Sequence, residues 1–354
     1  MADFIVSGVK IVGVGACVPS QVSCNLSLPL LGENSHKFID TTGIKYRRVS
    51  DKNICSSDLC FEATIRLLDG LKWERESIDC LIFVSQTHDY VLPATSCILQ
   101  KRLGLSSSCY ALDITLGCSG WVYGLSVISS LLSAGGIKRG LLLAGDTISK
   151  ICSSKDQSTY PLFGDAGTVT ALEFTGDIKN KFYFSMNTDG EGKDAIIVPH
   201  GGCRHPINTN SFIEEQGENG ISYNQTQLHL DGMDVFSFGI KRAPESVDHL
   251  LNVFNIEKDN VDYFLFHQAN LFMNNKIAKR IKIQSDVINK VPSSLEYFGN
   301  TSCASIPLTM VTKLKSDLEN RHLNMIACGF GVGLSWGSVY FQTANIVCND
   351  LTEL

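Results

Sequence analysis

The sequence predicts an α/β protein made of two similar halves. Apolar runs of strand length alternate with longer runs of helical spacing along the 354 residues, which is typical of a parallel or mixed sheet covered by helices on both faces. The chain is also too long for one simple core, and the order of elements after residue 232 repeats that of the first half. We therefore predict one half over residues 1–175 and a second over residues 176–354.

The first half contains the elements of such a sheet. Apolar runs predict a strand pair at residues 4–17 and single strands at 78–86, 140–145 and 163–174. Helical spacing predicts helices at 56–68, with two serines and an aspartate available as caps, and at 93–103, which starts at a proline. Residues 37–49 are polar and partly basic, and we expect a surface loop or a segment that faces a ligand.

The second half opens with a polar, glycine-rich segment at residues 176–232, where we expect one early strand followed by long surface loops. Regular elements then resume. We predict helices at 233–253, 271–281 and 305–318, and strands at 261–266, 323–328 and 337–344.

Composition excludes several classes of protein. The formal net charge of −6 differs from the basic balance of a nucleic-acid binder, so we expect no nucleic-acid partner. Hydrophobic content of 44% and charged content of 19% describe a compact globular protein. Apolar stretches of the ~18–20 residues that cross a membrane are absent, and the N-terminus shows no secretory signal, so we expect no membrane association.

The 13 cysteines are scattered through apolar segments without Cys-x-x-Cys pairs or zinc-ligand spacing. We therefore expect no bound metal. The pattern is typical of reduced thiols, and it predicts a cytoplasmic protein in which most cysteines are packing residues.

One cysteine has a different setting. Residues 109–125 read CYALDITLGCSGWVYGL, a strand that breaks at glycines and continues as a helix from Trp121. Cys118 then lies near the helix N-terminus, where free N–H groups and the helix dipole favour the nucleophilic thiolate. The alternative is a buried cysteine that packs as a small hydrophobe.

Polar groups also follow other predicted strands, where α/β proteins place their sites. In FLFHQAN, residues 264–270, His267 comes directly after an apolar strand and is followed by Gln268 and Asn270. The alternative for His267 is a core histidine bonded to the backbone. Asn300, in FGNTSCAS, either caps a turn or donates to the oxygen of a bound acyl group.

The stretch CGFGVGLSWG, residues 328–337, carries glycines at 329, 331 and 333. Glycine allows close backbone approach, so Gly331 is a candidate contact for a bound substrate, and Phe330 would cover whatever binds. The alternative is a tight hairpin with no further role.

A cysteine, a histidine and an asparagine suit a two-step condensation. The thiolate attacks a thioester to form an acyl-enzyme. The imidazole and the amide then stabilise the enolate that forms when a carboxylated thioester loses carbon dioxide, and backbone N–H groups hold the oxyanion. Papain-like proteases also use Cys, His and Asn, but GCSGW matches their cysteine signature only loosely and lies mid-chain.

Six stretches in this order resemble the β-ketoacyl-acyl carrier protein synthase III family of the thiolase superfamily. They are TTGIKYRR, GCSGWVYGLSV, FGDAGT, FHQAN, FGNTSCASIP and GFGVGLSWGS, and the likeness runs from about residue 6 to residue 341. The resemblance implies an α/β protein with the thiolase-like five-layered αβαβα fold of two similar halves, and a homodimer. It implies no permanently bound cofactor, with coenzyme A or acyl carrier protein phosphopantetheine thioesters as substrates.

The resemblance also implies residue roles. Cys118 would be the acylated nucleophile, and His267 with Asn300 the decarboxylation pair. Asn270 would contact the pantetheine arm, and Leu92 would contribute to the acyl pocket of the dimer partner. The backbone N–H groups of Cys118 and of Val332 would form the oxyanion hole, although relatives usually have glycine at the second position and a β-branched residue narrows the backbone geometry.

Other positions depart from the family pattern. Members that initiate fatty-acid synthesis stack a tryptophan on the adenine of coenzyme A and place arginines near its phosphates, whereas this chain has Lys37 or Phe38, Thr41 and Gln157. Phe38 can still stack, but the bidentate phosphate contacts are lost. We therefore expect a specialised relative, from a secondary-metabolite, surface-polysaccharide or similar pathway, that accepts a carrier-linked or unusual acyl thioester.

Basic residues follow the FHQAN motif. Lys276, Lys279 and Arg280 share one helical face by their spacing. Such a face is either simply solvated or, on an acidic protein, a docking surface for an acidic acyl carrier protein.

Two further functions remain open. A same-fold acyltransferase would keep Cys118 and form an ester or amide without decarboxylation. A non-catalytic subunit would only stabilise a partner synthase, and is expected to lose the cysteine that this chain retains.

Overall fold

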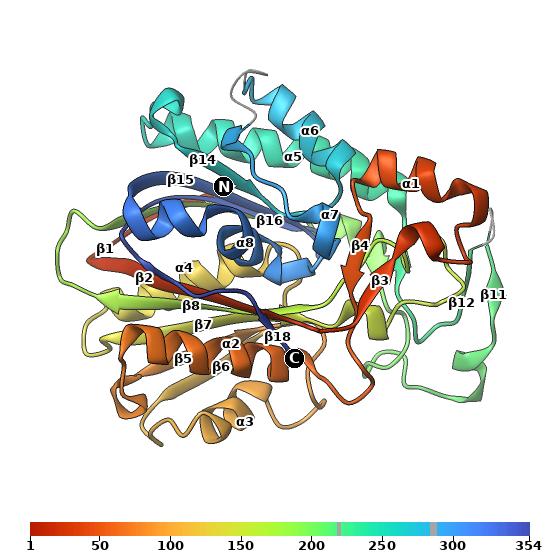
Figure 1. Cartoon of the computed structure of the whole chain (residues 1–354), viewed down its shortest axis with the longest axis horizontal. Coiled ribbons are helices and arrows are strands. Elements are labelled where there is room, and N and C mark those ends of the chain that lie inside the picture. Colours follow the sequence, from red (N-terminus) through yellow and green to blue (C-terminus); the bar gives the residue numbers. More distant parts are fainter. Residues whose placement is uncertain (218–220, 284–288) are drawn as a thin grey trace.

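Five layers make up the molecule. The computed structural model describes residues 1–217, 221–283 and 289–354. Two stacked sheets enclose helices α4 (Gly120–Ser133) and α8 (Ser305–Asn320), while α2 (Ser56–Leu71) and α3 (Thr95–Arg102) cover one outer face and α5 (Gly232–Val253) with α6 (Leu271–Arg280) covers the other (Figure 1). The expected αβαβα fold is confirmed.

Both sheets are mixed, as predicted. In the described part of the chain, one sheet has the order β1 (Ala2–Ser7), β9 (Lys181–Thr188), β16 (Ser335–Ala344), β15 (His322–Gly331), β14 (Tyr263–Phe266). The other has the order β17 (Val347–Cys348), β2 (Val9–Val18), β8 (Ala166–Phe174), β7 (Arg139–Asp146), β5 (Cys80–Val84), β6 (Tyr110–Ile114), and β18 (Thr352–Glu353) also pairs with β2. The pairs β5–β6, β5–β7 and β14–β15 are parallel.

The predicted strand pair at residues 4–17 is wrong in its pairing. β1 and β2 are strands, but β1 pairs with β9 and β2 pairs with β8, in different sheets. Gly8 between them has a φ of +82°, which redirects the chain from one sheet to the other at little cost for glycine.

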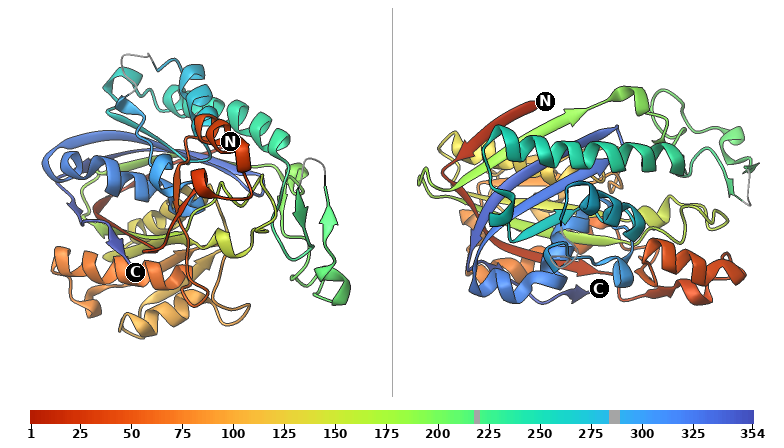
Figure 2. Two further views of the ribbon diagram at one scale, coloured as in Figure 1. Left: turned by 45° about the vertical axis from the view of Figure 1, so that its right-hand side comes forward. Right: turned by 90° about the horizontal axis from the view of Figure 1, so that it is seen from above.

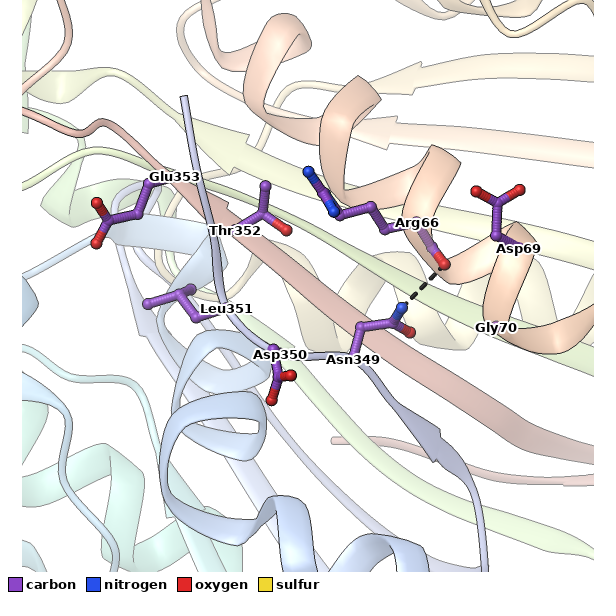
Figure 3. A pocket seen from close by; sticks show the side chains of 8 residues that line it. All are labelled: Arg66, Asp69, Gly70, Asn349, Asp350, Leu351, Thr352 and Glu353. Carbon is purple, nitrogen blue, oxygen red and sulfur yellow. Dashed lines mark hydrogen bonds between the residues drawn. The ribbon is translucent and has the colours of Figure 1, made fainter.

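The N-terminal strand β1 joins the sheet formed mainly by the second half of the chain, and the C-terminal residues join the sheet formed by the first half. Residues 349–353 run beside α2 and β2, and the Asn349 side-chain amide donates to the Arg66 carbonyl at 2.9 Å (Figure 3). Each sheet thus takes an end strand from the other half of the chain. The division at residue 175 stays a prediction.

Residues 37–49, expected as a loop, contain regular structure. Helix α1 (Ser35–Thr42) ends at Gly43, whose φ is +73°, and β4 (Tyr46–Arg48) pairs with β3 (Val22–Cys24). One of the basic residues of this segment, Arg47, has a structural role. It is buried and donates to the carbonyls of Tyr160 and Phe163 at 2.7 and 3.0 Å. It fixes a loop that borders the candidate site.

The remaining predicted helices and strands are present, with ends shifted by a few residues. The segment at 176–232 contains β9 and then short strands, β10 (Ile196–Ile197), β11 (Glu215–Gln216), β12 (Ser222–Tyr223) and β13 (His229–Leu230). Its green middle part stands away from the two sheets (Figure 2). A short helix α7 (Leu295–Phe298), not predicted, precedes Asn300. Among the described helices, none is long and apolar enough to cross a bilayer.

Candidate active site

Cys118 lies in the turn between β6 and α4, as predicted. Two glycines allow the turn to sit against β5: a Cβ at Gly117 would overlap Gln86 Oε1, and a Cβ at Gly120 would lie 2.6 Å from Val84 Cγ1. The Gly120 N–H donates to the Gly117 carbonyl at 2.6 Å and closes the turn. The small residues around Cys118 are therefore required by packing.

The glycine-rich stretch at the end of β15 reaches the same cysteine. A Cβ at Gly331 would lie 2.5 Å from Cys118 Cβ and 2.9 Å from its Sγ. The hairpin interpretation is also correct, because β15 and β16 pair up to Gly331 and Ser335. A hydrogen bond of 2.7 Å between the hydroxyls of Ser119 and Ser335 ties the hairpin to the start of α4.

His267 follows β14 directly and is 2% exposed. Its Nδ1 lies 2.8 Å from Ser305 Oγ, and its ring packs edge-on against Phe330 at a centroid distance of 5.5 Å. The histidine is buried and bonded, as the alternative predicted, and it also lines the cavity beside Cys118. Its catalytic role stays a prediction.

Asn300 has a fixed side-chain orientation. Its Oδ1 accepts a hydrogen bond of 2.9 Å from the Ser302 N–H, the turn contact foreseen as the alternative, and its own N–H donates to Leu162. With Oδ1 held in this way, the amide NH2 group is the part of the side chain available to donate to a ligand in the cavity that Asn300 lines.

One mainly apolar cavity of about 450 Å³ brings these groups together. Of the residues named from the sequence, it is lined by Cys118, His267, Asn300, Asn270, Phe330, Gly331 and Phe38. Asn270 has a structural role as well, because its Oδ1 accepts from the Met273 N–H and caps α6 at 2.8 Å. Gln268, in contrast, is buried and bonded to Phe266 and Ser293, away from this set.

The protonation state of Cys118 differs from the expectation. Burial raises the pKa of its thiol to about 12, and the negative charge of Asp146 acts in the same direction. The backbone N–H groups of Val332 and Cys118 and the nearby hydroxyl of Ser302 lower the pKa, but by less. The prediction of a resting thiolate is wrong, because desolvation outweighs the helix N-terminus.

His267 is a neutral imidazole at physiological pH. Burial lowers its pKa from 6.5 to about 3, and the opposing contribution is a hydrogen bond to the main chain of Ser302. The ring therefore carries no charge beside Cys118 at neutral pH.

Other predicted residues lie outside this cavity. Leu92 is 84% exposed, next to Tyr90 and Val91, in the loop before α3. Lys276, Lys279 and Arg280 are exposed on α6, and Arg280 donates to the Ile240 carbonyl in α5 at 2.7 Å. None of the four predicted residues lines the cavity.

The structure adds residues that sequence reasoning missed. Phe236 of α5 stacks on Phe272 of α6 at 5.5 Å, and both line the cavity. Asp146, at the end of β7, is buried and accepts from Ser85 and Thr87. The Phe236–Phe272 stack and the burial of Asp146 depend on contacts between distant elements. The local sequence contains no signal for such contacts.

Comparisons with known proteins identify relatives of the whole chain. Residues 112–190 match the family model for 3-oxoacyl-[acyl-carrier-protein (ACP)] synthase III, and residues 251–343 match that of its C-terminal part. A β-ketoacyl-[acyl-carrier-protein] synthase III of Rhodopirellula baltica is 30% identical over 353 residues, which cover 95% of this chain and 98% of the relative. One of Prochlorococcus marinus is 33% identical, with 94% and 96% covered. The crystal structure of a 3-oxoacyl-(acyl-carrier protein) synthase of Burkholderia xenovorans superposes with a TM-score of 0.92 at 40% identity, over 100% of this chain and 99% of that one.

Proposed function

The chain belongs to the 3-oxoacyl-[acyl-carrier-protein] synthase III family and is a condensing enzyme of the acyltransferase class, and we propose that Cys118, His267 and Asn300 carry out its two half-reactions. The observation that carries the assignment is that one cavity is lined by a thiol, a neutral imidazole and an oriented amide. No permanently bound cofactor is needed for either half-reaction.

In the first half-reaction, Cys118 Sγ attacks the carbonyl carbon of an acyl thioester. The new carbon–sulfur bond forms, the bond to the donor thiol breaks, and the proton of Cys118 leaves with the donor thiolate. The backbone N–H groups of Cys118 and Val332 would hold the oxyanion of this step, and their effect in lowering the pKa of the Cys118 thiol supports that role. The β-branched side chain of Val332 packs near the Gly117 Cα, with its Cγ1 3.2 Å from a Cβ placed there.

In the second half-reaction, a malonyl-type thioester loses carbon dioxide. The electron pair moves onto the thioester oxygen, which accepts hydrogen bonds from His267 and from the Asn300 amide. The enolate carbon attacks the acyl-Cys118 carbonyl, the β-ketoacyl product leaves, and the released thiolate takes a proton from solvent. A neutral imidazole suits this role, because it donates without adding a buried charge.

The phosphopantetheine arm of the substrate would run along the apolar cavity. Asn270 retains its amide NH2 after capping α6, so it can donate to an amide carbonyl of the arm. Phe38, Phe236 and Phe272 supply aromatic faces along the same cavity. Phe330 covers His267 and limits the space beside the sulfur.

We propose a carrier-linked or otherwise unusual acyl donor. Thr41, at a position where initiating relatives carry a phosphate-binding arginine, donates its hydroxyl to the Lys37 carbonyl at 2.9 Å. Its side chain is thus engaged within α1. Thr41 and Gln157 both lack the guanidinium fork that binds phosphate in a bidentate manner, so coenzyme A would lose those contacts.

We also propose a homodimer. Tyr90, Val91 and Leu92 form an exposed apolar run, with Val91 92% exposed, and a second copy would cover it and receive Leu92 in its acyl pocket. We propose that Lys276 and Lys279 form a basic surface beside the cavity that binds an acyl carrier protein.

The unpaired state of all 13 cysteines supports a location in a reducing cytoplasm.

Intact-protein mass spectrometry tests the assignment directly. The protein is incubated with acyl-CoA and acyl-carrier thioesters of increasing chain length, and peptide mapping locates the added acyl group. We expect acylation of Cys118 and faster acylation by carrier-linked donors. Carbon dioxide release from a malonyl thioester decides the reaction type, because its absence together with ester or amide formation would show an acyltransferase without condensation. Rapid formation of acetoacetyl-acyl carrier protein from acetyl-CoA and malonyl-acyl carrier protein would contradict the proposal of an unusual acyl donor.

A further inference from the structure

Ser302 has an unusual backbone and an unusual side chain. Its φ is +52°, in the left-handed region that residues with a side chain seldom adopt, and the residue is 1% exposed. Its hydroxyl is buried and has no hydrogen-bond partner among the described residues. Both features are unfavourable for folding, and strain of this kind concentrates at functional sites.

The three polar groups of Ser302 point to three different residues. Its N–H donates to Asn300 Oδ1 at 2.9 Å, and its main chain hydrogen-bonds the imidazole of His267. Its hydroxyl makes no hydrogen bond to the described residues at rest and lies near enough to the sulfur of Cys118 to lower the pKa of that thiol. The left-handed backbone therefore lets one residue hold the amide, orient the imidazole and face the sulfur.

The charges around Cys118 explain why a hydroxyl matters there. Asp146 from β7 raises the thiol pKa, the imidazole of His267 is neutral, and Cys303 is a buried thiol whose own pKa is raised. These groups provide no positive charge for a sulfur anion. The remaining stabilisation comes from dipoles, which are two backbone N–H groups and the Ser302 hydroxyl.

We propose that Ser302 is a further catalytic residue, whose hydroxyl donates a hydrogen bond to Cys118 Sγ in each state in which the sulfur carries negative charge. This inference rests on the proposed function. The hydroxyl keeps its proton in both half-reactions. It first stabilises the thiolate that attacks the acyl donor, and it later stabilises the same thiolate as the leaving group when the β-ketoacyl product departs.

Two substitutions separate the hydroxyl from the backbone. Ser302→Ala removes the hydroxyl and keeps a Cβ at positive φ, whereas Ser302→Gly removes the hydroxyl and relieves the backbone. Thr301→Val is the matched control, because it deletes a neighbouring buried hydroxyl that also has no partner in the described part of the chain. Thermal unfolding of each variant reports on folding.

The first readout is the alkylation of Cys118 by iodoacetamide between pH 7 and 9, followed on the Cys118 peptide so that exposed cysteines do not interfere. A hydrogen bond to a charged group is usually equivalent to about one or two pKa units. In the Ser302 variants a smaller fraction of Cys118 is ionised, but the more basic thiolate is a better nucleophile, so the alkylation rate falls by less than the thiolate fraction does. We expect both Ser302 variants to react about 10-fold more slowly, and Thr301→Val to react like the wild type.

The second readout compares the two half-reactions. We expect self-acylation to fall about 10-fold or more in both Ser302 variants, with malonyl decarboxylation changed less than 3-fold in Ser302→Gly. If only Ser302→Ala is slow and Ser302→Gly matches the wild type, the backbone matters and the hydroxyl proposal is wrong. Wild-type alkylation rates in both variants would also overturn it. A wild type that is neither acylated nor able to release carbon dioxide would instead refute the proposed function, while the alkylation comparison would still decide the role of the hydroxyl.

Discussion

The side chain of Cys118 rests directly on the α-carbon of Gly331. A methyl group at Gly331 would lie 2.5 Å from Cys118 Cβ and 2.9 Å from Sγ, well inside van der Waals contact. The two residues come from different sheets, because Cys118 follows β6 and Gly331 ends β15. Cys118 is therefore positioned by contact between segments that follow or end strands of the two sheets.

This contact predicts that Gly331→Ala displaces the sulfur. Because Cys118 is held by the turn behind it, the added methyl group cannot be accommodated without movement, and overpacking of this kind costs about 1–3 kcal/mol. We expect self-acylation to fall at least about 10-fold, measured by mass spectrometry in a single turnover. Gly202→Ala is the control, since a Cβ there meets no atom within 4 Å. Normal acylation of Gly331→Ala would show that the contact does not position Cys118.

His267 and Asn300 are predicted to act in the second half-reaction only. Asn300→Asp keeps an oxygen that accepts from the Ser302 N–H and loses the amide donor. We expect a fall of about 10²–10³ in decarboxylation, as for the loss of one oxyanion donor, with self-acylation nearly unchanged. His267→Ala should behave in the same way. Equal losses in both half-reactions would indicate a structural effect, which circular dichroism would detect.

The pKa of His267 predicts how the decarboxylation rate depends on pH below neutrality. Since burial lowers this pKa from 6.5 to about 3, the ring stays neutral above about pH 4, and the decarboxylation rate should show no loss near pH 6.5. A decline centred between pH 6 and 7 would mean that the imidazole titrates normally.

The same shift predicts acid destabilisation. The unfolded chain binds a proton at His267 below pH 6.5, whereas the folded chain does so only near pH 3. The contribution of the neutral ring to stability is complete above pH 6.5 and is lost as the pH falls toward 3, by at most about 1.4 kcal/mol per pH unit. Urea unfolding across this range should show a shallower pH dependence for His267→Gln.

The basic face of α6 predicts a carrier-specific effect. Lys276→Glu with Lys279→Glu should raise the KM for a carrier-linked malonyl thioester about 5-fold to 10-fold at low salt, and leave the KM for a small thioester unchanged. Arg280 is left intact because it bonds α5. Lys138→Glu with Lys179→Glu, at exposed sites before β7 and β9, is the charge-matched control. Equal effects on both substrates would remove the docking proposal.

The exposed apolar residues Tyr90, Val91 and Leu92 predict that two copies of the chain associate through this loop. Val91→Asp places a charge where a second copy would cover an apolar side chain, so sedimentation velocity should show a dimer for the wild type and a shift toward monomer for the variant. Val22→Asp, at another exposed valine in β3, serves as the control. A wild-type monomer at micromolar concentration would contradict the homodimer.

The sequence by itself determined the α/β class, most helices and strands, and the stretches that contain Cys118, His267 and Asn300. These features depend on local periodicity, on proline and glycine positions and on motif order, all of which can be read along the chain. The helix at Ser35–Thr42 was not predicted because it is short and has only two large apolar residues, Phe38 and Ile39.

Only the tertiary structure decided which strands share a sheet, whether Cys118 is charged, and what Ser302 faces. Gly8 sends β1 into the second sheet, a choice made by pairing with β9 far along the chain. The pKa of Cys118 depends on burial by both halves and on the charge of Asp146, and desolvation is not encoded in any one segment. The left-handed backbone of Ser302 bonds Asn300 within the same turn, whereas His267 reaches it from the end of β14, far along the chain.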